Sequence, residues 1–472
     1  MVASFTDLPP ELWALIFHEY WSGSAGFVID QSHTSDSVAA NISGVCRKWR
    51  DIVLGMPTLW TLYTVRDPIS DPESNREELL QSVVRRLVPL LPRAGSREVS
   101  IRFESLAQDE GGWMTGLLEL ISSRAESLHA ASLIWVHTTD RPDPFFTLQT
   151  EPAFSEAPGL RRLTIGATGA VNLLSWPYFS LSGWDSLPRC LTVFRSLEAW
   201  MGLDDCLRVL RECPMIEECA LALVEADSLF ENPSFDPTNI TPRMTLPNLH
   251  TLHLVFSELY PYLWYHITVP SLRTFSISAI HSEHDAWVAR VNHAPFLALL
   301  KRSNPLLTSL ALHFDFTDCS AEFIQILGLL STLEELTMRF YIPHVAPFSE
   351  FRRLSEYLAY DPARPLPLPR LHTLCVDVTD YTVALVISRS NPTARAAHAP
   401  GVRLRDVTLY APNGHLAPQW SAVEQLEANG VHVRVEEVAY CGGYTGEGTI
   451  KSFTEMERFS ASYAAPRIAR AS

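Results

Sequence analysis

The chain has 472 residues, of which 47% are hydrophobic and 19% are charged, and its formal net charge is −16. This composition is typical of a globular protein with a large core, and it argues against a disordered chain. The acidic balance, without an evident basic face, argues against nucleic-acid binding. The length leaves room for two or three domains, or for a repeat array with a small extra module.

The cysteine content and the hydropathy pattern indicate a compartment. The eight cysteines are scattered and form no CxxC motif. Together with the lack of a signal-peptide pattern, this predicts free thiols rather than a disulfide framework. No apolar run approaches the roughly 20 residues of a membrane-spanning helix. We therefore expect a cytoplasmic or nuclear protein that contacts no membrane.

The first predicted helix begins at the proline pair Pro9–Pro10, because proline suits the first helical turn, where its missing N–H costs nothing. Its apolar residues fall into two stripes at helical spacing, Leu8, Leu12, Leu15 and Ile16 in one and Trp13, Phe17 and Tyr20 in the other. A helix that packs against a single core needs one stripe. Two stripes therefore predict two packing partners.

A second helix is predicted over residues 37–54, with apolar residues on one face and charged residues on the other. Together with the first helix it makes a unit of about 60 residues, a size that buries only about 60% of its unfolded surface. The unit carries more apolar surface than it can cover alone. Such a surplus indicates a surface for a partner.

The two helical segments carry a family resemblance. The segment LPPELWALIF, followed by VCRKWRDIV and PTLW, resembles an F-box. The loop between the two halves is longer than in the shortest F-boxes and resembles those of large fungal F-box families. The resemblance implies docking on the Skp-type adaptor of a cullin-RING ubiquitin ligase. It assigns this contact to Leu8, Pro9, Leu12, Ile16, Phe17, Val45, Cys46 and Trp49. The alternative is that these residues form the core of a small N-terminal cap.

Further along the chain, a short pattern of the form L-x-x-L-x-L recurs, in most instances with a proline two residues before its first leucine. It occurs as PGLRRLTI (158–165), PMIEECAL (214–221), PNLHTLHL (247–254), PSLRTFSI (270–277), PLLTSLAL (305–312), STLEELTM (331–338), PRLHTLCV (369–376) and VRLRDVTL (402–409). Weaker instances are predicted at 97–103 and 128–133, and a degenerate one near 191–200. Helical signals lie between the instances. A strand and a helix that repeat about every 30 residues are typical of a solenoid.

This pattern resembles the leucine-rich-repeat family over roughly residues 95–440, and an F-box followed by such repeats is a known combination. We therefore predict an α/β fold, in which a solenoid has parallel strands on one face and helices on the other. The predicted domains are an F-box at 1–62, a helical connector at 63–98, an irregular leucine-rich-repeat solenoid at 99–440 and a disordered tail at 441–472. An ordinary α/β domain with apolar strands is the alternative.

The predicted strands also indicate where a target binds. Side chains alternate along a strand, so the pattern leucines point to the helices and their neighbours line the other face. Repeat proteins commonly bind partners on that face. Its mixed polar side chains suit a protein target. We predict target binding by His253, His313, Asp315, Arg339, Asp377 and Tyr410.

Motifs for covalent chemistry are weak. The segment GYTGEGTIKS has Ile450 where a phosphate-binding loop needs glycine. In HSEHD, His281, His284 and Asp285 form a potential metal site, but no further ligand cluster is evident. We therefore expect a protein that is not an enzyme and needs no cofactor.

The predicted function is that of a substrate-recognition subunit of an SCF-type ubiquitin ligase. It would bind the adaptor through the F-box and an unknown target protein through the repeats. The alternative is a non-catalytic repeat scaffold whose N-terminal helices only cap the solenoid.

Overall fold

The computed structural model describes most of the chain between residues 8 and 438. The described residues are 8–22, 27–29, 38–66, 82–83, 85–95, 97–105, 129–137, 148–149, 159–168, 178–180, 187–223, 243–256, 263–279, 293–313, 321–339, 348–361, 363, 365–377, 380–390, 404–412 and 420–438. The chain divides into two compact units, Met1–Ala222 and Leu223–Ser472. The division falls inside the range predicted as one repeat array. The predicted tail at 441–472 lies outside the described residues.

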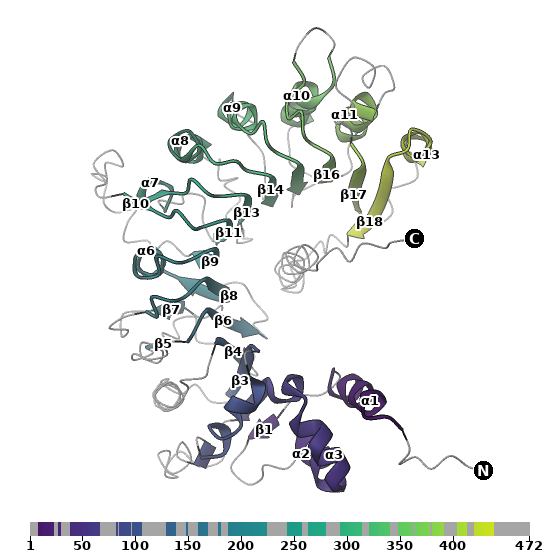
Figure 1. Ribbon diagram of the computed structural model, residues 1–472. Helices are drawn as coiled ribbons and strands as arrows, with labels where there is room; N and C mark the ends of the chain where they lie inside the picture. The colour runs from purple at the N-terminus through teal and green to yellow at the C-terminus, as the bar shows by residue number, and fades with distance from the viewer. Residues whose placement is uncertain are drawn as a thin grey trace, which may run out of the picture. The chain divides into compact units, whose positions relative to one another are not determined.

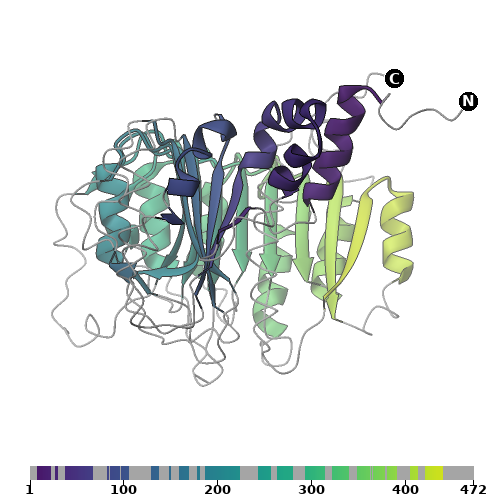
Figure 2. The same ribbon diagram turned by 90° about the horizontal axis from the view of Figure 1, so that it is seen from below.

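Unit 1 opens with helices α1 (Pro10–Ser22), α2 (Val38–Val45) and α3 (Arg47–Leu54) and the 3-10 turn η2 (Pro57–Trp60), which lie side by side in purple (Figures 1 and 2). Helix α1 begins at the predicted prolines, where the Pro9 carbonyl accepts hydrogen bonds from the amides of Leu12 at 3.1 Å and Trp13 at 3.3 Å.

The prediction of one helix over residues 37–54 is wrong, because the chain breaks at Cys46. This residue has extended backbone angles, φ −157° and ψ 168°, between α2 and α3. Its carbonyl accepts a hydrogen bond from the amide of Arg50 at 3.0 Å, so Cys46 caps a new helix. Gly44 lowers the helical preference of the chain just before the break.

The strands of unit 1 follow one another across a sheet in chain order. They are β1 (Phe27–Ile29), β2 (Leu62–Arg66), β3 (Val99–Ser105), β4 (Ala130–His137), β6 (Arg162–Thr168), β8 (Val193–Met201) and β9 (Glu218–Leu223). The short β7 (Tyr178–Ser180) pairs with β8, and the short β5 (Leu148–Gln149) pairs with β7. The turn η3 (Leu91–Ala94) and helix α6 (Leu203–Glu212) connect them. The pairs from β1 to β8 are parallel.

The prediction of a helical connector at 63–98 is wrong at its start, because the first residues of this range form a strand. Residues 62–66 form β2 and pair with β3. Tyr63 and Val65 alternate into the core and are buried, as β-branched and aromatic residues favour in strands.

Unit 2 repeats a strand and a helix, and its helices lie on one side of the strands (Figure 1). The strands are β11 (Thr251–Phe256), β13 (Thr274–Ala279), β14 (Ser309–His313), β15 (Glu335–Arg339), β16 (Thr373–Asp377), β17 (Asp406–Pro412) and β18 (His432–Val438). The helices are α8 (His293–Ser303), α9 (Ala321–Leu329), α10 (Phe348–Leu358), α11 (Asp380–Ser390) and α13 (Trp420–Ala428). A small parallel pair joins β10 (Met244–Thr245) to β12 (Ile267–Thr268). Strand β10 precedes β11, whereas helix α7 (Leu263–His266) and β12 lie between β11 and β13.

The predicted α/β fold and the strand positions are confirmed. In each of the eight pattern segments a strand begins at the fifth residue, for example Thr251 in the segment that starts at 247. The weaker instances coincide with β3 and β4, and the degenerate one with β8.

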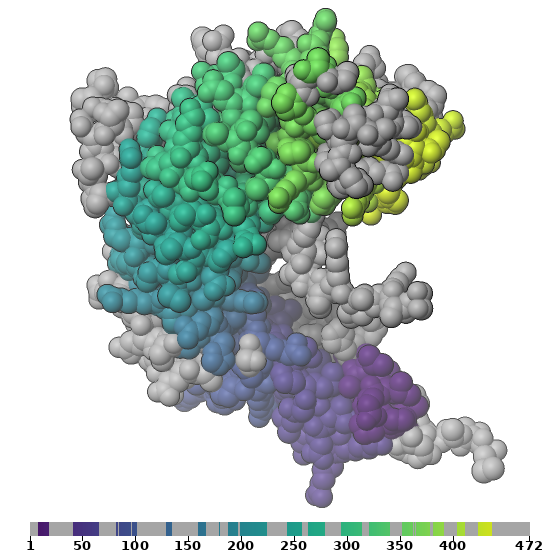
Figure 3. All heavy atoms as spheres, turned by 45° about the horizontal axis from the view of Figure 1, so that its top comes forward, coloured from purple at the N-terminus to yellow at the C-terminus, as the bar shows by residue number. Residues whose placement is uncertain are grey.

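The register of unit 2 aligns the pattern leucines in layers. Leu252 lies beside Phe275, which lies beside Leu310 and then Leu336 and Leu374. All five side chains are at most 1% exposed. Because burying one such side chain contributes roughly 1.5–3 kcal/mol, the repeated layer stabilises the whole unit. The helices lie along this layer (Figure 1), and Figure 3 shows the atoms of unit 2, green to yellow, packed closely together.

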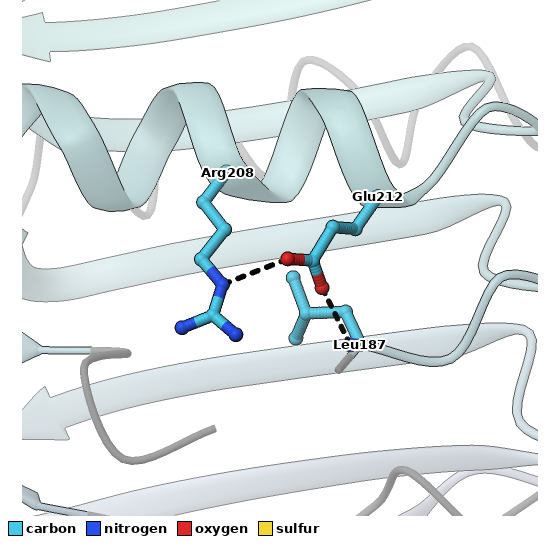
Figure 4. Close-up of polar contacts among 3 residues, drawn as sticks. All are labelled: Leu187, Arg208 and Glu212. Carbon is cyan, nitrogen blue, oxygen red and sulfur yellow. Dashed lines mark hydrogen bonds and ion pairs between the residues drawn. The ribbon is translucent and has the colours of Figure 1, made fainter. Parts of the chain in front are cut away.

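Polar contacts connect successive repeats at the helix ends. In unit 1, Glu212 of α6 accepts hydrogen bonds from the Leu187 amide at 2.9 Å and from Arg208 Nε at 2.8 Å (Figure 4). In unit 2, Nη2 of Arg302 at the end of α8 donates to the carbonyls of Trp264 at 2.6 Å and Ile267 at 2.7 Å. Each contact fixes the last turn of a helix to the preceding part of the chain.

Candidate functional site

The N-terminal helices enclose a small aromatic core. The ring of Trp49 on α3 lies 4.6 Å from that of Trp13 and 5.2 Å from that of Phe17, both on α1. Trp13 and Phe17 are 2% and 3% exposed. Phe17 is thus a core residue of this module, and its assignment to the adaptor-facing set is corrected. The second stripe of α1, which contains Trp13 and Phe17, therefore packs against α3 of the same chain.

The first stripe of α1 has no such cover. Leu12, Leu15 and Ile16, which we call the apolar stripe, are 46%, 65% and 45% exposed. They occupy positions i, i+3 and i+4 and therefore lie on one face of the helix. The structure thus shows one of the two packing partners predicted for α1, and the prediction of a second partner remains a prediction. The site residues predicted from the sequence omitted Leu15, although it shares the spacing of its neighbours.

The second segment of the F-box pattern meets the first at the start of α1. Lys48 Nζ donates to the Leu8 carbonyl at 3.3 Å. This contact places the junction between α2 and α3 (Val45–Lys48) beside the first turn of α1. At the junction Val45 is 61% exposed, and Cys46 is exposed as well. Exposed residues from both halves of the pattern therefore lie near the start of α1.

The module is held to the first strands of unit 1. The Trp60 indole donates to the Val53 carbonyl at 2.9 Å, and the Tyr63 hydroxyl donates to the Trp60 carbonyl at 2.8 Å. The Arg93 guanidinium lies 4.5 Å from the centre of the Trp60 ring. Burial raises the pKa of the Tyr63 phenol, so this hydroxyl stays protonated and remains a donor. These contacts fix the orientation of α3.

In unit 2, most of the residues predicted to bind a target lie in one row, at the carboxyl ends of the strands. His313 pairs in register with Arg339, and Asp377 pairs with Tyr410. The Arg339 guanidinium reaches across β16 and lies 4.2 Å from the centre of the Tyr410 ring. His253 lies two residues nearer the amino ends of the strands, since Val255 is the residue of β11 in register with Ser278 and His313. Asp315 lies outside the described residues.

This polar row is buried, which corrects the expectation of an accessible face at these positions. The exposed fractions of His313, Arg339, Asp377 and Tyr410 are 5%, 8%, 6% and 5%. Because neighbouring strands are only about 4.8 Å apart, long side chains on this face cover one another, as Arg339 covers Tyr410. His253 is half-buried.

The environment of the buried row keeps one of its members, His313, uncharged. Burial, followed by the charges of Arg339 and His253, lowers the pKa of His313 to about 3. His313 is therefore uncharged near neutral pH. Toward the amino ends of the same face, the side chains of Asp406 and His432 are 59% and 72% exposed and lie 3.7 Å apart.

Among the described residues, no group of three His, Cys, Asp or Glu side chains is arranged to hold a metal ion. The HSEHD and GYTGEGTIKS segments lie outside those residues. The buried thiols of unit 1 are unreactive in character, because burial raises the pKa of Cys213 to about 12 and that of Cys206 well above its usual value.

None of the helices that the structure describes has the length and apolar character needed to cross a membrane. A scan against models of known protein families gives no match, and no curated protein matches the sequence significantly.

Proposed function

We propose that the chain is a substrate-recognition subunit of an SCF-type cullin-RING ubiquitin ligase. Its N-terminal helices bind the Skp-type adaptor, and its strand–helix repeats, which we assign to the leucine-rich-repeat class, hold a target protein. Catalysis of ubiquitin transfer belongs to other subunits. This chain contributes proximity, since a bound target is held at high effective concentration near the ubiquitin carrier.

One observation carries the proposal. Helix α1 buries Trp13 and Phe17 within the chain, yet leaves Leu12, Leu15 and Ile16 about half exposed or more. An exposed apolar row on a short, firmly anchored helix is typical of a protein-binding surface. The F-box-like sequence pattern is the reason for proposing a Skp-type adaptor as the partner. The exposed residues at the helix junction extend the surface beyond α1.

The proposal is tested by Leu12→Asp combined with Ile16→Asp. Because both side chains are exposed, the change leaves the core intact while placing two charges in the interface. We expect capture of purified adaptor to fall by at least about 100-fold, in line with the loss of buried interface residues. The matched control is Leu306→Asp combined with Leu329→Asp, two exposed leucines of unit 2. Adaptor binding that survives the α1 changes contradicts the proposal.

The scaffold alternative is favoured by the contacts of Trp60 and Arg93, through which the module covers the first strands. In that case the helices cap the repeats and bind no adaptor. Wild-type protein that fails to capture the adaptor, together with lowered thermal stability after deletion of residues 1–56, would support this alternative.

A further inference from the structure

Helix α3, which packs against the helix that carries the apolar stripe, has a charge opposite to that of the whole chain. The eight residues of α3, RKWRDIVL, contain three basic residues and one acidic residue, a net charge of +2. The whole chain carries −16. Arg47, Lys48 and Arg50 are all exposed. A local reversal of sign on an accessible surface is the pattern that steers a partner by charge.

These basic residues border the apolar surface. Lys48 donates to the Leu8 carbonyl at 3.3 Å, which places the start of α3 beside the start of α1. Arg50 Nε donates to the Ser43 carbonyl at 3.0 Å, which holds its side chain along α2. Exposed Val45 directly precedes this group in the chain. The positive charge of α3 therefore begins beside the first turn of α1, which contains exposed Leu12.

Resting on the function proposed above, we infer that the adaptor presents an acidic group to this basic rim (Arg47, Lys48 and Arg50). The basic rim would act on the approach of the partner. A partner with acidic groups is repelled at long range by the net charge of −16, and local positive charge at the docking surface offsets this repulsion at close range. Charge at an interface rim acts mainly on the association rate, whereas the apolar contact determines how slowly the complex dissociates.

The test uses two opposite charge reversals on one face of α3. Arg47 and Asp51 are four residues apart and both are exposed, so they are neighbours on the helix surface. Arg47→Glu should lower the association rate with purified Skp-type adaptor by about tenfold at low salt, and Asp51→Lys should raise it. Arg47→Gln should fall between wild type and Arg47→Glu. The dissociation rate should change little in all three.

Controls separate this inference from the underlying function. Arg211→Glu, an exposed residue of α6, makes the same charge change away from the surface and should leave the association rate within about twofold. The differences should vanish at ~1 M salt, where charges are screened. Unchanged rates in Arg47→Glu, or faster binding, overturn the acidic-partner inference while adaptor binding itself stands. A wild-type chain that does not bind the adaptor overturns both.

Discussion

At the scale of single residues, the least expected feature is a neutral histidine inside a polar row. His313 lies beside Arg339 and near His253, and its pKa is lowered to about 3, chiefly by burial. The unfolded chain protonates this histidine near pH 6.5. Between these two pH values the unfolded state binds more protons than the folded state. Stability is therefore highest above pH 6.5 and falls as the pH is lowered toward 3.

We expect this linkage to cost unit 2 up to about 5 kcal/mol at the acid end of that range. Replacing the histidine by an uncharged residue, His313→Gln, should reduce the slope of stability against pH between 6.5 and 3. Urea unfolding at a series of pH values measures it. The exposed, non-titrating Leu306 provides the control, because Leu306→Gln should leave the slope unchanged. Equal slopes in both variants and in wild type would show that His313 is not the group responsible.

At the scale of elements, a buried arginine joins two repeats of unit 2. Arg389 of α11 donates to the carbonyls of Leu358 at 3.0 Å, Pro367 at 3.1 Å and Leu368 at 2.9 Å. Leu368 has φ 48°, a left-handed conformation that is unfavourable for a leucine. Burial lowers the pKa of Arg389 to about 10, so it remains charged at neutral pH. The guanidinium therefore holds the end of α10 and a strained turn in place.

Arg389→Ala should destabilise unit 2 by about 3 kcal/mol, because three carbonyls lose a charged donor. Arg389→Lys should recover only part of this loss, since an ammonium group lacks the planar fork. Chemical denaturation gives the comparison. Arg352→Ala removes an exposed ion pair with Glu356 at 2.7 Å and should cost little stability, because exposed pairs are screened by solvent. Each variant is compared by its loss in free energy of unfolding. If the Arg389→Ala loss exceeds the Arg352→Ala loss by less than about 1 kcal/mol, Arg389 does not hold the two repeats together.

At the scale of the whole molecule, two properties oppose each other. The net charge of −16 keeps copies of the chain apart, whereas the apolar stripe on α1 favours self-association when no partner covers it. We expect the isolated chain to be monomeric at ~0.01 M salt and to self-associate at ~1 M salt, where the repulsion is screened.

Sedimentation velocity at the two salt concentrations measures this balance. Leu12→Asp combined with Ile16→Asp should remain monomeric at both. Self-association that persists in this variant would place the self-associating surface elsewhere on the chain.

The sequence by itself determined the periodic part of this protein. The spacing of leucines after proline located the strands, because a strand buried on one face needs an apolar residue at every second position. The prolines located the start of α1 for an equally local reason. Helix α13 ends just before Asn429 and Gly430. Gly430 has φ 72°, a conformation that glycine adopts without strain. The two stripes of α1 likewise predicted two faces, because residues three or four apart share one side of a helix.

Only the tertiary structure decided which apolar or polar residue is covered. Phe17 and Ile16 are adjacent and both strongly apolar, yet Phe17 packs against Trp49, while Ile16 remains 45% exposed. His313 and His432 both lie on strands, but His313 is buried in its row whereas the side chain of His432 is 72% exposed. These outcomes rest on contacts between residues far apart in the chain, and the local spacing of residue types carries no information about them.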